Sequence, residues 1–418
     1  MTRASFLGLV AAWAPLAPLA PLGAQRGLTA RLSGQGILVG TYADPVAGGQ
    51  SLGEVRLVQP IIMLDVGLPR LRLTFHATAD FEGWTMPHGE LAPGDWGEGY
   101  VDRRHPHTYV HELMLSAEDV LGHFDGKART TLSVGKGFVP FGTDDPMSRP
   151  VERFPVNHHL SQILERALVM AEVDVGPATI EGAVFNGDEP ESPGQSPSLS
   201  RVGDSWAARL TLRPLPGLEW QGSRAVVHSP ENRAGAGTDA RKWSTSVRAD
   251  RRAGPAHLYA LVEWARTSEA DGVFVFHSVL AEAAVTAGRH QPYYRFERTE
   301  RPEDMRTLDP FRSVRPHLDN SILGTSRWSI HTLGYGLRLG APIGHPDVVP
   351  FIEVSYGRIA TVDGGLFDPT TFYGRDSFWS ASGGLRIAWG MRGHRMGRYG
   401  VPTRTMDMPA MTEPDRAR

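Results

Sequence analysis

In this sequence, stretches in which polar and apolar residues alternate are joined by connectors that are alternately very short and very long. From Gly34 to Met391, polar and apolar side chains alternate in successive stretches. The tight turns are Gly67–Pro69, Gly176–Pro177, Pro214–Gly217 and Ala253–Pro255, and the long polar connectors are Thr85–His107, Val139–Glu165, Gly187–Gly203 and Glu300–Gly324. A soluble sandwich has no reason to keep this order, whereas a membrane barrel has short turns at one rim and long loops at the other. The rhythm therefore predicts an all-β, transmembrane antiparallel β-barrel.

The first residues have the pattern of a secretory signal peptide. Arg3 precedes a largely apolar run over residues 5–22, and Gly23 and Ala24 form a small-residue cleavage site. A disordered tail rich in alanine and proline is the alternative. No later stretch reaches the roughly 18 apolar residues that a spanning helix needs. We therefore expect a signal peptide over 1–24, a barrel over 25–399 and a polar C-terminal tail over 400–418.

Composition excludes several classes of function. The 418 residues include no cysteine, so disulfides, thiolate metal sites and cysteine nucleophiles are absent. The formal net charge of -3 argues against a nucleic-acid partner. A mean hydropathy of -0.26 is too polar for a helical membrane protein but suits a barrel with a wet inner face. No cofactor motif is recognised, and we expect no cofactor.

Alternation along the chain gives about 16 strands, an even number within the range of bacterial single-chain barrels. In the segment from Arg70, for example, Leu71, Leu73 and Phe75 alternate with polar neighbours. The strands are expected to begin near Gly34, Gly53, Arg70, Thr108, Lys127, Arg166, Ala178, Asp204, Leu218, Arg241, Pro255, Val273, Gln291, Thr325, Val348 and Ser377. A barrel this wide leaves an aqueous lumen, whereas eight strands would be filled by side chains.

Three local motifs resemble outer-membrane porins of the phosphate-selective type. The run Val134–Gly142 (VGKGFVPFG) is similar to the family's G-K-x-x-x-P-F-G strand end. Leu164–Leu168 (LERAL) resembles the start of its next strand, and Ala183–Gly187 (AVFNG) resembles its F-N-G strand end. The resemblance implies a 16-stranded channel whose third extracellular loop folds inward and narrows the pore. That loop corresponds to residues 142–165 of this sequence.

The charged residues of this loop are the candidate pore constriction. They are Arg149, Arg153, His158, His159, Asp144, Asp145 and Glu152. Family members selective for phosphate have a lysine cluster there, and this loop has no lysine, so phosphate selectivity is not predicted. A constriction of mixed charge sets which solutes enter, and the carboxylates cancel much of the field of the cations. The alternatives are a loop that projects into the medium and charges that are simply solvated.

The polar faces of the strands supply a candidate pore wall. Its basic members are Arg72, Lys127, Arg129, Arg209, Arg213, Arg248, Arg338 and Arg386. Basic residues have a modest majority over carboxylates on these faces, which predicts a weak anion preference. The alternative is that opposite charges pair across strands and only keep the lumen wet.

Two further constellations concern metal ions. His105, His107 and His111 have a spacing that could bring imidazoles together around Zn²⁺ or Cu²⁺, although Pro106 breaks the strand register. We assign no metal site from this pattern and leave the histidines open. The Asp144-Asp145 pair fits Ca²⁺ or an Asp-Pro turn, and the turn is favoured.

The sequence as a whole predicts a passive porin of the bacterial outer membrane. Its expected partners are outer-membrane lipid and small hydrophilic solutes or anions, and a homotrimer is possible. Two rival functions stay open: a barrel enzyme that hydrolyses lipid or peptide, and a non-conducting barrel with a structural or metal-binding role. We expect no enzymatic activity, but catalysis needs only a few residues on any fold.

Overall fold

The structure is a computed structural model. It describes residues 28–45, 49, 51–85, 107–121, 128–156, 160–190, 192–229, 237–304, 322–339, 346–363, 368–390 and 395–399. Several predictions lie outside these residues. They concern the signal peptide (1–24), the polar tail (400–418), Lys127, His105, His158 and His159.

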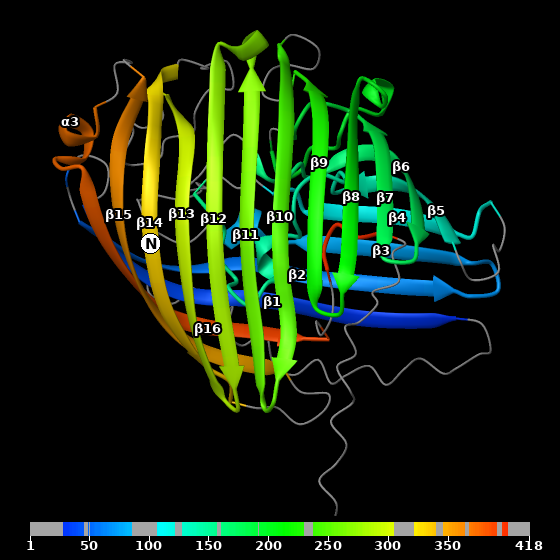
Figure 1. Ribbon diagram of the computed structural model, residues 1–418, viewed down its shortest axis with the longest axis horizontal. Helices are drawn as coiled ribbons and strands as arrows, with labels where there is room; N and C mark the ends of the chain where they lie inside the picture. Colours follow the sequence, from blue (N-terminus) through cyan, green and yellow to red (C-terminus); the bar gives the residue numbers. More distant parts are fainter. Residues whose placement is uncertain are drawn as a thin grey trace, which may run out of the picture.

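Sixteen antiparallel strands close into one barrel, because the first strand pairs with the last (Figure 1). The register of that closing pair runs from Gly34 opposite Trp389 to Asp44 opposite Trp379. The strands are β1 (Thr29–Asp44), β2 (Leu52–Leu68), β3 (Leu73–Asp80), β4 (Val110–Glu118), β5 (Ala128–Gly137), β6 (Arg166–Val175), β7 (Ala178–Phe185), β8 (Ser205–Leu215), β9 (Leu218–His228), β10 (Asp239–Ala253), β11 (Ala256–Glu269), β12 (Phe274–Ala287), β13 (His290–Asp304), β14 (Ile322–Leu337), β15 (Asp347–Asp363) and β16 (Ser377–Trp389).

The predicted fold class is confirmed. All sixteen expected strands are present, and the largest shift is at β1, which was expected near Gly34 and begins at Thr29. A two-residue period locates the strands because one face of a barrel strand is apolar and the other is polar.

The barrel wall is apolar outside and polar inside. In β11, Glu263 is only 3% exposed, whereas its neighbours Val262 and Trp264 are 56% and 37% exposed. In β15, Glu353 is buried and Ile352 is 66% exposed. Because successive side chains point to opposite faces, the buried carboxylates lie on the inner wall and the exposed apolar groups form the outer surface. This is the pattern of a barrel that faces lipid outside and polar surroundings within.

The two rims differ at most connectors, as the sequence predicts. Two-residue turns join β6 to β7, β8 to β9, β10 to β11 and β12 to β13, and the longest connectors lie at the opposite ends of the strands (Figure 1). The β11–β12 connector is short although it lies at the long-loop rim, because it contains only the 3-10 turn η6 (Ala270–Gly272) before Val273. The other short helices are α2 (Glu82–Thr85), η3 (Pro146–Ser148), η5 (Leu199–Arg201) and α3 (Pro369–Tyr373). None of the described helices is long and apolar enough to cross a membrane.

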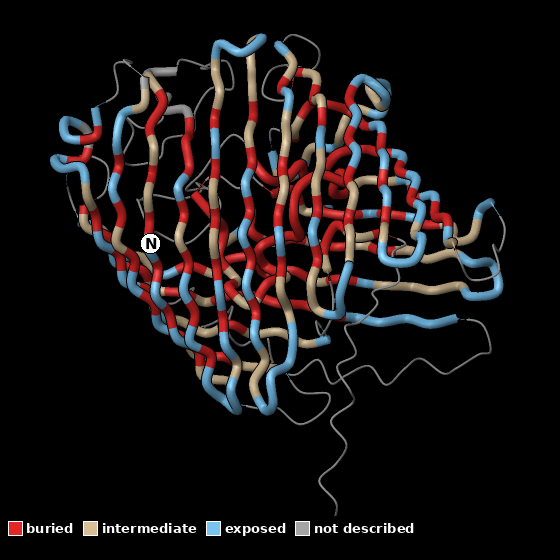
Figure 2. The backbone as a smooth tube through the Cα atoms, in the orientation of Figure 1, coloured by how far each residue is buried: buried red, intermediate tan, exposed pale blue. Residues whose placement is uncertain are grey.

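The described residues of the connector between β5 and β6, 138–156 and 160–165, are mostly buried against the wall. Its Phe138, Phe141 and Ile163 belong to a buried cluster with Met114 of β4 and Phe185 of β7. Buried segments of the chain run inside the ring of strands (Figure 2). Hydrophobic contacts therefore fix both ends of the connector against the wall.

Candidate functional site

Near the start of the β5–β6 connector, the backbone of Gly142 lies so close to that of Ser161 that only glycine fits. Gly142 has a φ of +70°, and a Cβ there would lie 1.5 Å from the carbonyl oxygen of Ser161. Only a residue without a Cβ can hold the two arms of the connector this close together. Asp145 then caps η3, because its carboxylate accepts the Met147 N–H at 2.7 Å. This cap supports the turn interpretation of the Asp144-Asp145 pair.

Arg149 points from the connector to the far wall. Its guanidinium lies 3.6 Å from Glu263 of β11 and 3.6 Å from Glu282 of β12. It also donates to the backbone carbonyl of Asp144, at 2.6 and 3.0 Å. Buried charges need such partners, and here wall carboxylates supply them. The first cation of the predicted constriction is therefore neutralised at its position.

Arg153 makes a second anchor on the other side of the connector. It donates to Glu353 at 2.7 Å and to Ser355 at 2.9 Å, both on β15. In the reverse direction, Arg295 of β13 donates to the backbone carbonyls of Val151 and Arg153, at 3.1 and 2.5 Å. The exchange of donors between wall and connector holds this part of the chain in one position.

Glu152 has the most open position of the predicted constriction residues that the structure describes. Its side chain keeps 32% exposure and lies 3.6 Å from Arg386 of β16. Arg386 itself is buried and stands 4.3 Å from the ring centroid of Phe351. A cation held over an aromatic face is stabilised by the ring quadrupole.

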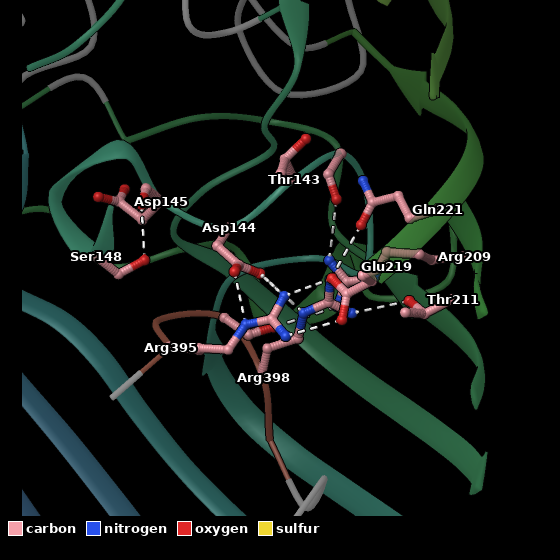
Figure 3. Close-up of polar contacts among 12 residues, drawn as sticks. Thr143, Asp144, Asp145, Ser148, Arg209, Thr211, Glu219, Gln221, Arg395 and Arg398 are labelled. Atoms are coloured by element: carbon pink, nitrogen blue, oxygen red, sulfur yellow. Dashed lines mark hydrogen bonds and ion pairs between the residues drawn. The ribbon is translucent and has the colours of Figure 1, made fainter. Parts of the chain in front are cut away.

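The C-terminal segment, residues 395–399, follows the last strand and contacts the β5–β6 connector at Asp144 (Figure 3). Arg395 makes paired bonds to Asp144 at 2.6 and 2.8 Å, and to Glu219 of β9 at 2.8 and 3.0 Å. Arg398 donates to Asp144 at 3.1 Å and to Glu181 of β7 at 2.9 Å. The connector and the C-terminal segment are thus tied to each other and to the wall.

A tyrosine completes the C-terminal contact. The hydroxyl of Tyr399 donates to Glu112 of β4 and accepts the backbone N–H of Phe138, at 3.0 Å from that nitrogen. Burial and the nearby Glu112 carboxylate raise the pKa of Tyr399 well above its ordinary value, so the hydroxyl keeps its proton. The segment also packs closely on Phe138, because a Cβ at Gly397 (φ +77°) would lie 2.9 Å from that side chain.

We call this set of charges the arginine cluster. It consists of Arg209, Arg213, Arg248, Arg395, Arg398, Asp144, Glu172, Glu181 and Glu219. Burial by itself raises the pKa of Asp144, but Arg395, Arg248 and Arg398 overcome this effect and hold that pKa well below its usual range. Asp144 therefore stays ionised and binds three guanidinium groups.

The predicted wall residues divide into two groups. Arg209, Arg248 and Arg386 lie on the inner wall, where Arg209 forms a paired bond with Glu181 at 2.5 and 2.6 Å. Arg213 is partly buried and lies 3.2 Å from Glu219. These four residues lie where the arginine cluster and the connector meet the wall.

The other described wall residues lie near the rims. Arg72 belongs to the β2–β3 turn, with a φ of +53°, and its side chain is 53% exposed. Arg129 lies exposed near the start of β5. Arg338 follows the end of β14, and its side chain is 40% exposed beside Asp347. Alternation assigned these residues a face but not their distance from the rim.

Sequence reasoning missed the C-terminal segment and several of the acidic partners. The sequence marks the segment only as the end of the barrel domain, because Arg395–Tyr399 has no strand period. The missed partners on the wall are Glu219, Glu263, Glu282 and Arg295. An arginine pair and a tyrosine just beyond the closing strand were the available signal.

Comparison with known proteins gives the fold. No family model and no curated protein matches this chain. The high pH structure of OprB from Pseudomonas putida aligns over 87% of this chain and 94% of its own, with 11% identity and a TM-score of 0.52. The chain has the fold of an outer-membrane porin. The closed barrel and this likeness support the bacterial outer membrane as its location.

Two other solved structures are similar at lower scores. The outer membrane channel DcaP of Acinetobacter baumannii aligns over 89% of this chain and 99% of its own, with 13% identity and a TM-score of 0.49. The anion-selective porin from Comamonas acidovorans aligns over 87% and 100%, with 12% identity and a TM-score of 0.48. None of the three is named as phosphate-selective, and the resemblance to that porin family stays a prediction.

Proposed function

We propose that this chain is an outer-membrane porin, a passive diffusion channel for small hydrophilic solutes. The observation that carries the proposal is a closed sixteen-strand barrel with a polar inner wall and an apolar outer one. A barrel of this strand number is wide enough to leave water inside. The diffusion path would be narrowed by two parts of the chain, the β5–β6 connector and the C-terminal segment.

The proposed ion preference is weakly toward anions. In the described part of the arginine cluster, Arg209, Arg213, Arg248, Arg395 and Arg398 stand against Asp144, Glu172, Glu181 and Glu219, a small excess of cations. Elsewhere Arg149 and Arg153 of the connector, together with Arg295 of the wall, are matched by Glu263, Glu282 and Glu353. Solutes would therefore meet a weak net field.

A second candidate function is a barrel closed by its own chain. Met147 and Phe154 of the connector pack against Ile37 of β1 and Val58 of β2. Arg149, only two residues after Met147, lies against β11 and β12. Since the connector touches wall strands from separate parts of the barrel, it spans the interior. This observation favours a non-conducting barrel over an open one.

Planar bilayers separate the two candidates. The full-length protein is compared with a truncation after Gly390, which removes the C-terminal segment, and with a control truncation after Tyr399, which retains it. The porin proposal expects stepwise conductance from the full chain, a larger unitary conductance after the first truncation, and no change after the control. Folded protein that leaves the bilayer closed in all three forms would overturn the porin proposal and support the closed barrel.

The proposal includes two expected partners, outer-membrane lipid and further copies of this chain. The apolar outer wall is suited to contact with outer-membrane lipid. A homotrimer stays a prediction, and the mass of the detergent-solubilised protein, corrected for bound detergent, would test it.

A further inference from the structure

Four buried side chains converge between the end of β3 and the start of β4. Asp80 ends β3, Glu82 begins α2, His107 precedes β4 and His111 lies on it. Ligating atoms of Asp80, His107 and His111 all lie within 4.8 Å of one another. The Nδ1 atom of His107 is 3.1 Å from Asp80 and 3.1 Å from Glu82. Separate parts of the chain thus bring Asp80 and two imidazoles together, with the Glu82 carboxylate beside His107.

The two carboxylates are held so that one oxygen of each faces His107. Asp80 accepts the Glu82 N–H on Oδ1 at 2.7 Å, which leaves Oδ2 toward the imidazole. Glu82 accepts the Gln59 N–H on Oε1 at 3.3 Å, which leaves Oε2 toward the same nitrogen. A single ring nitrogen carries at most one proton, so it cannot donate well to both carboxylates.

A third carboxylate, that of Glu165, orients the His111 ring through its Nδ1 atom. Glu165, at the end of the β5–β6 connector, lies 2.6 Å from its Nδ1 and is itself fixed by the Thr108 N–H at 2.9 Å. The Nε2 atom of His111 is buried and has no hydrogen-bond partner among the described residues. The centroids of the His107 and His111 rings are 4.7 Å apart. A carboxylate on one imidazole nitrogen is the usual arrangement when the other nitrogen binds a metal.

We propose that Asp80, Glu82, His107 and His111 bind one divalent transition-metal ion, with Zn²⁺ as the preferred ion. Two imidazoles and two carboxylates are ligands that Zn²⁺ accepts, whereas Ca²⁺ and Mg²⁺ take oxygen ligands. In a tetrahedral zinc site neighbouring ligand atoms lie about 3.3 Å apart. The two 3.1 Å separations at His107 Nδ1 are close to that value.

The third carboxylate, Glu165, has Lys136 as a cation 4.0 Å away. We call Asp80, Glu82, His107, His111 and Glu165 the histidine cluster.

The site would connect two long connectors of the barrel. Asp80, Glu82 and His107 flank the β3–β4 connector, while Glu165 closes the β5–β6 connector. The His111 ring also stands edge-on to Phe138 at 5.2 Å. A bound ion would thus fix the ends of both connectors against β4, and this role holds whether or not the barrel conducts.

The first test uses the unaltered full-length barrel, refolded in detergent without an affinity tag of histidines and stripped with a chelator. Titration with ZnSO₄ should show one site per chain by calorimetry. Titration with CoCl₂ should give the intense visible absorption of a tetrahedral, nitrogen- and oxygen-liganded ion. Protein that shows neither stoichiometric zinc nor a cobalt spectrum would overturn the proposal.

The second test assigns the ligands. His111→Ala and Asp80→Asn should abolish the cobalt spectrum, and Glu165→Gln, which alters the positioning residue, should weaken zinc 10- to 100-fold. The matched control is His228→Ala, which removes a half-exposed histidine that also pairs with an aspartate, Asp239, at 2.7 Å. Far-UV circular dichroism checks that each variant is folded. Zinc bound as tightly by folded His111→Ala and Asp80→Asn as by wild type would mean that the ion binds elsewhere.

Discussion

Two polar clusters hold the β5–β6 connector, and they are built from different groups. Around Asp144, near the start of the connector, the chain supplies three guanidinium groups, from Arg248, Arg395 and Arg398. Around His107 and His111, near its end, imidazoles contact carboxylates. The first cluster pairs a carboxylate with cations of the chain itself, whereas the second offers the imidazole and carboxylate groups that a metal ion binds.

The largest expected effect comes from removing the carboxylate at the centre of the arginine cluster. Asp144→Ala leaves three largely buried guanidinium groups short of a partner, and breaking buried charge pairs in this way costs about 3–5 kcal/mol of unfolding free energy. Unfolding of the refolded barrel in guanidinium chloride measures the loss. The control, Asp239→Ala, breaks a half-exposed pair and should cost no more than about 1 kcal/mol. Equal losses in the two variants would mean that Asp144 is not an anchor.

The next largest effect is stabilisation by Zn²⁺, which should depend on the histidine cluster and not on the arginine cluster. Free Zn²⁺ at a hundred times its dissociation constant should raise the unfolding free energy of wild type by about 2.7 kcal/mol. The same increment is expected in Asp144→Ala, because the clusters share no residue and independent sites contribute additively. His111→Ala should show no increment. A zinc increment lost in Asp144→Ala would join the clusters into one cooperative unit.

The strands could be predicted from sequence, whereas the interior contacts could not. A period of two residues marks each strand locally, so Leu71, Leu73 and Phe75 suffice to place a face. Asp144 and Arg395 are far apart in sequence and meet only because the barrel closes. Arg395–Tyr399 has no period, and its two arginines and tyrosine are the only local sign that this segment differs from a polar tail.

The histidine cluster shows the same limit. The spacing of His105, His107 and His111 leaves a metal site open but assigns none, and the other members of the cluster come from β3, α2 and the end of the β5–β6 connector. Their meeting depends on the β3–β4 register, in which Ala79 lies opposite Val110, and on a bulge just before it. A sequence read one strand at a time cannot supply that register.

Acidification should distinguish Asp144 from an ordinary aspartate. Its pKa in the folded state is depressed, so its stabilisation is fully present above the ordinary aspartate pKa of about 3.9 and is lost as pH falls toward the folded value. The difference in unfolding free energy between wild type and Asp144→Asn should therefore stay constant from pH 7 to pH 5 and shrink only below about pH 4. Guanidinium titrations at several pH values measure it. A difference that shrinks between pH 7 and pH 5 would show that Asp144 does not bear these arginine contacts.

The smallest effect concerns ion preference. Arg149→Ala uncovers Glu263 and Glu282, and Arg153→Ala uncovers Glu353, so each should shift the reversal potential toward cations. We expect a change in permeability ratio of less than about fivefold, equivalent to ~1 kcal/mol, if water screens these charges as it does at exposed sites. Arg241→Ala, which alters an exposed pair with Asp271, is the control and should give no shift.

The truncation after Gly390 sharpens this last measurement. Without Arg395 and Arg398, Asp144 and Glu219 lose cations and the arginine cluster loses its excess positive charge. The truncated barrel should therefore shift further toward cations than Arg149→Ala does. If instead Arg149→Ala gives the larger shift, the connector alone controls the path and the C-terminal segment lies aside from it. The order of the two shifts thus decides which cluster the permeating ion meets.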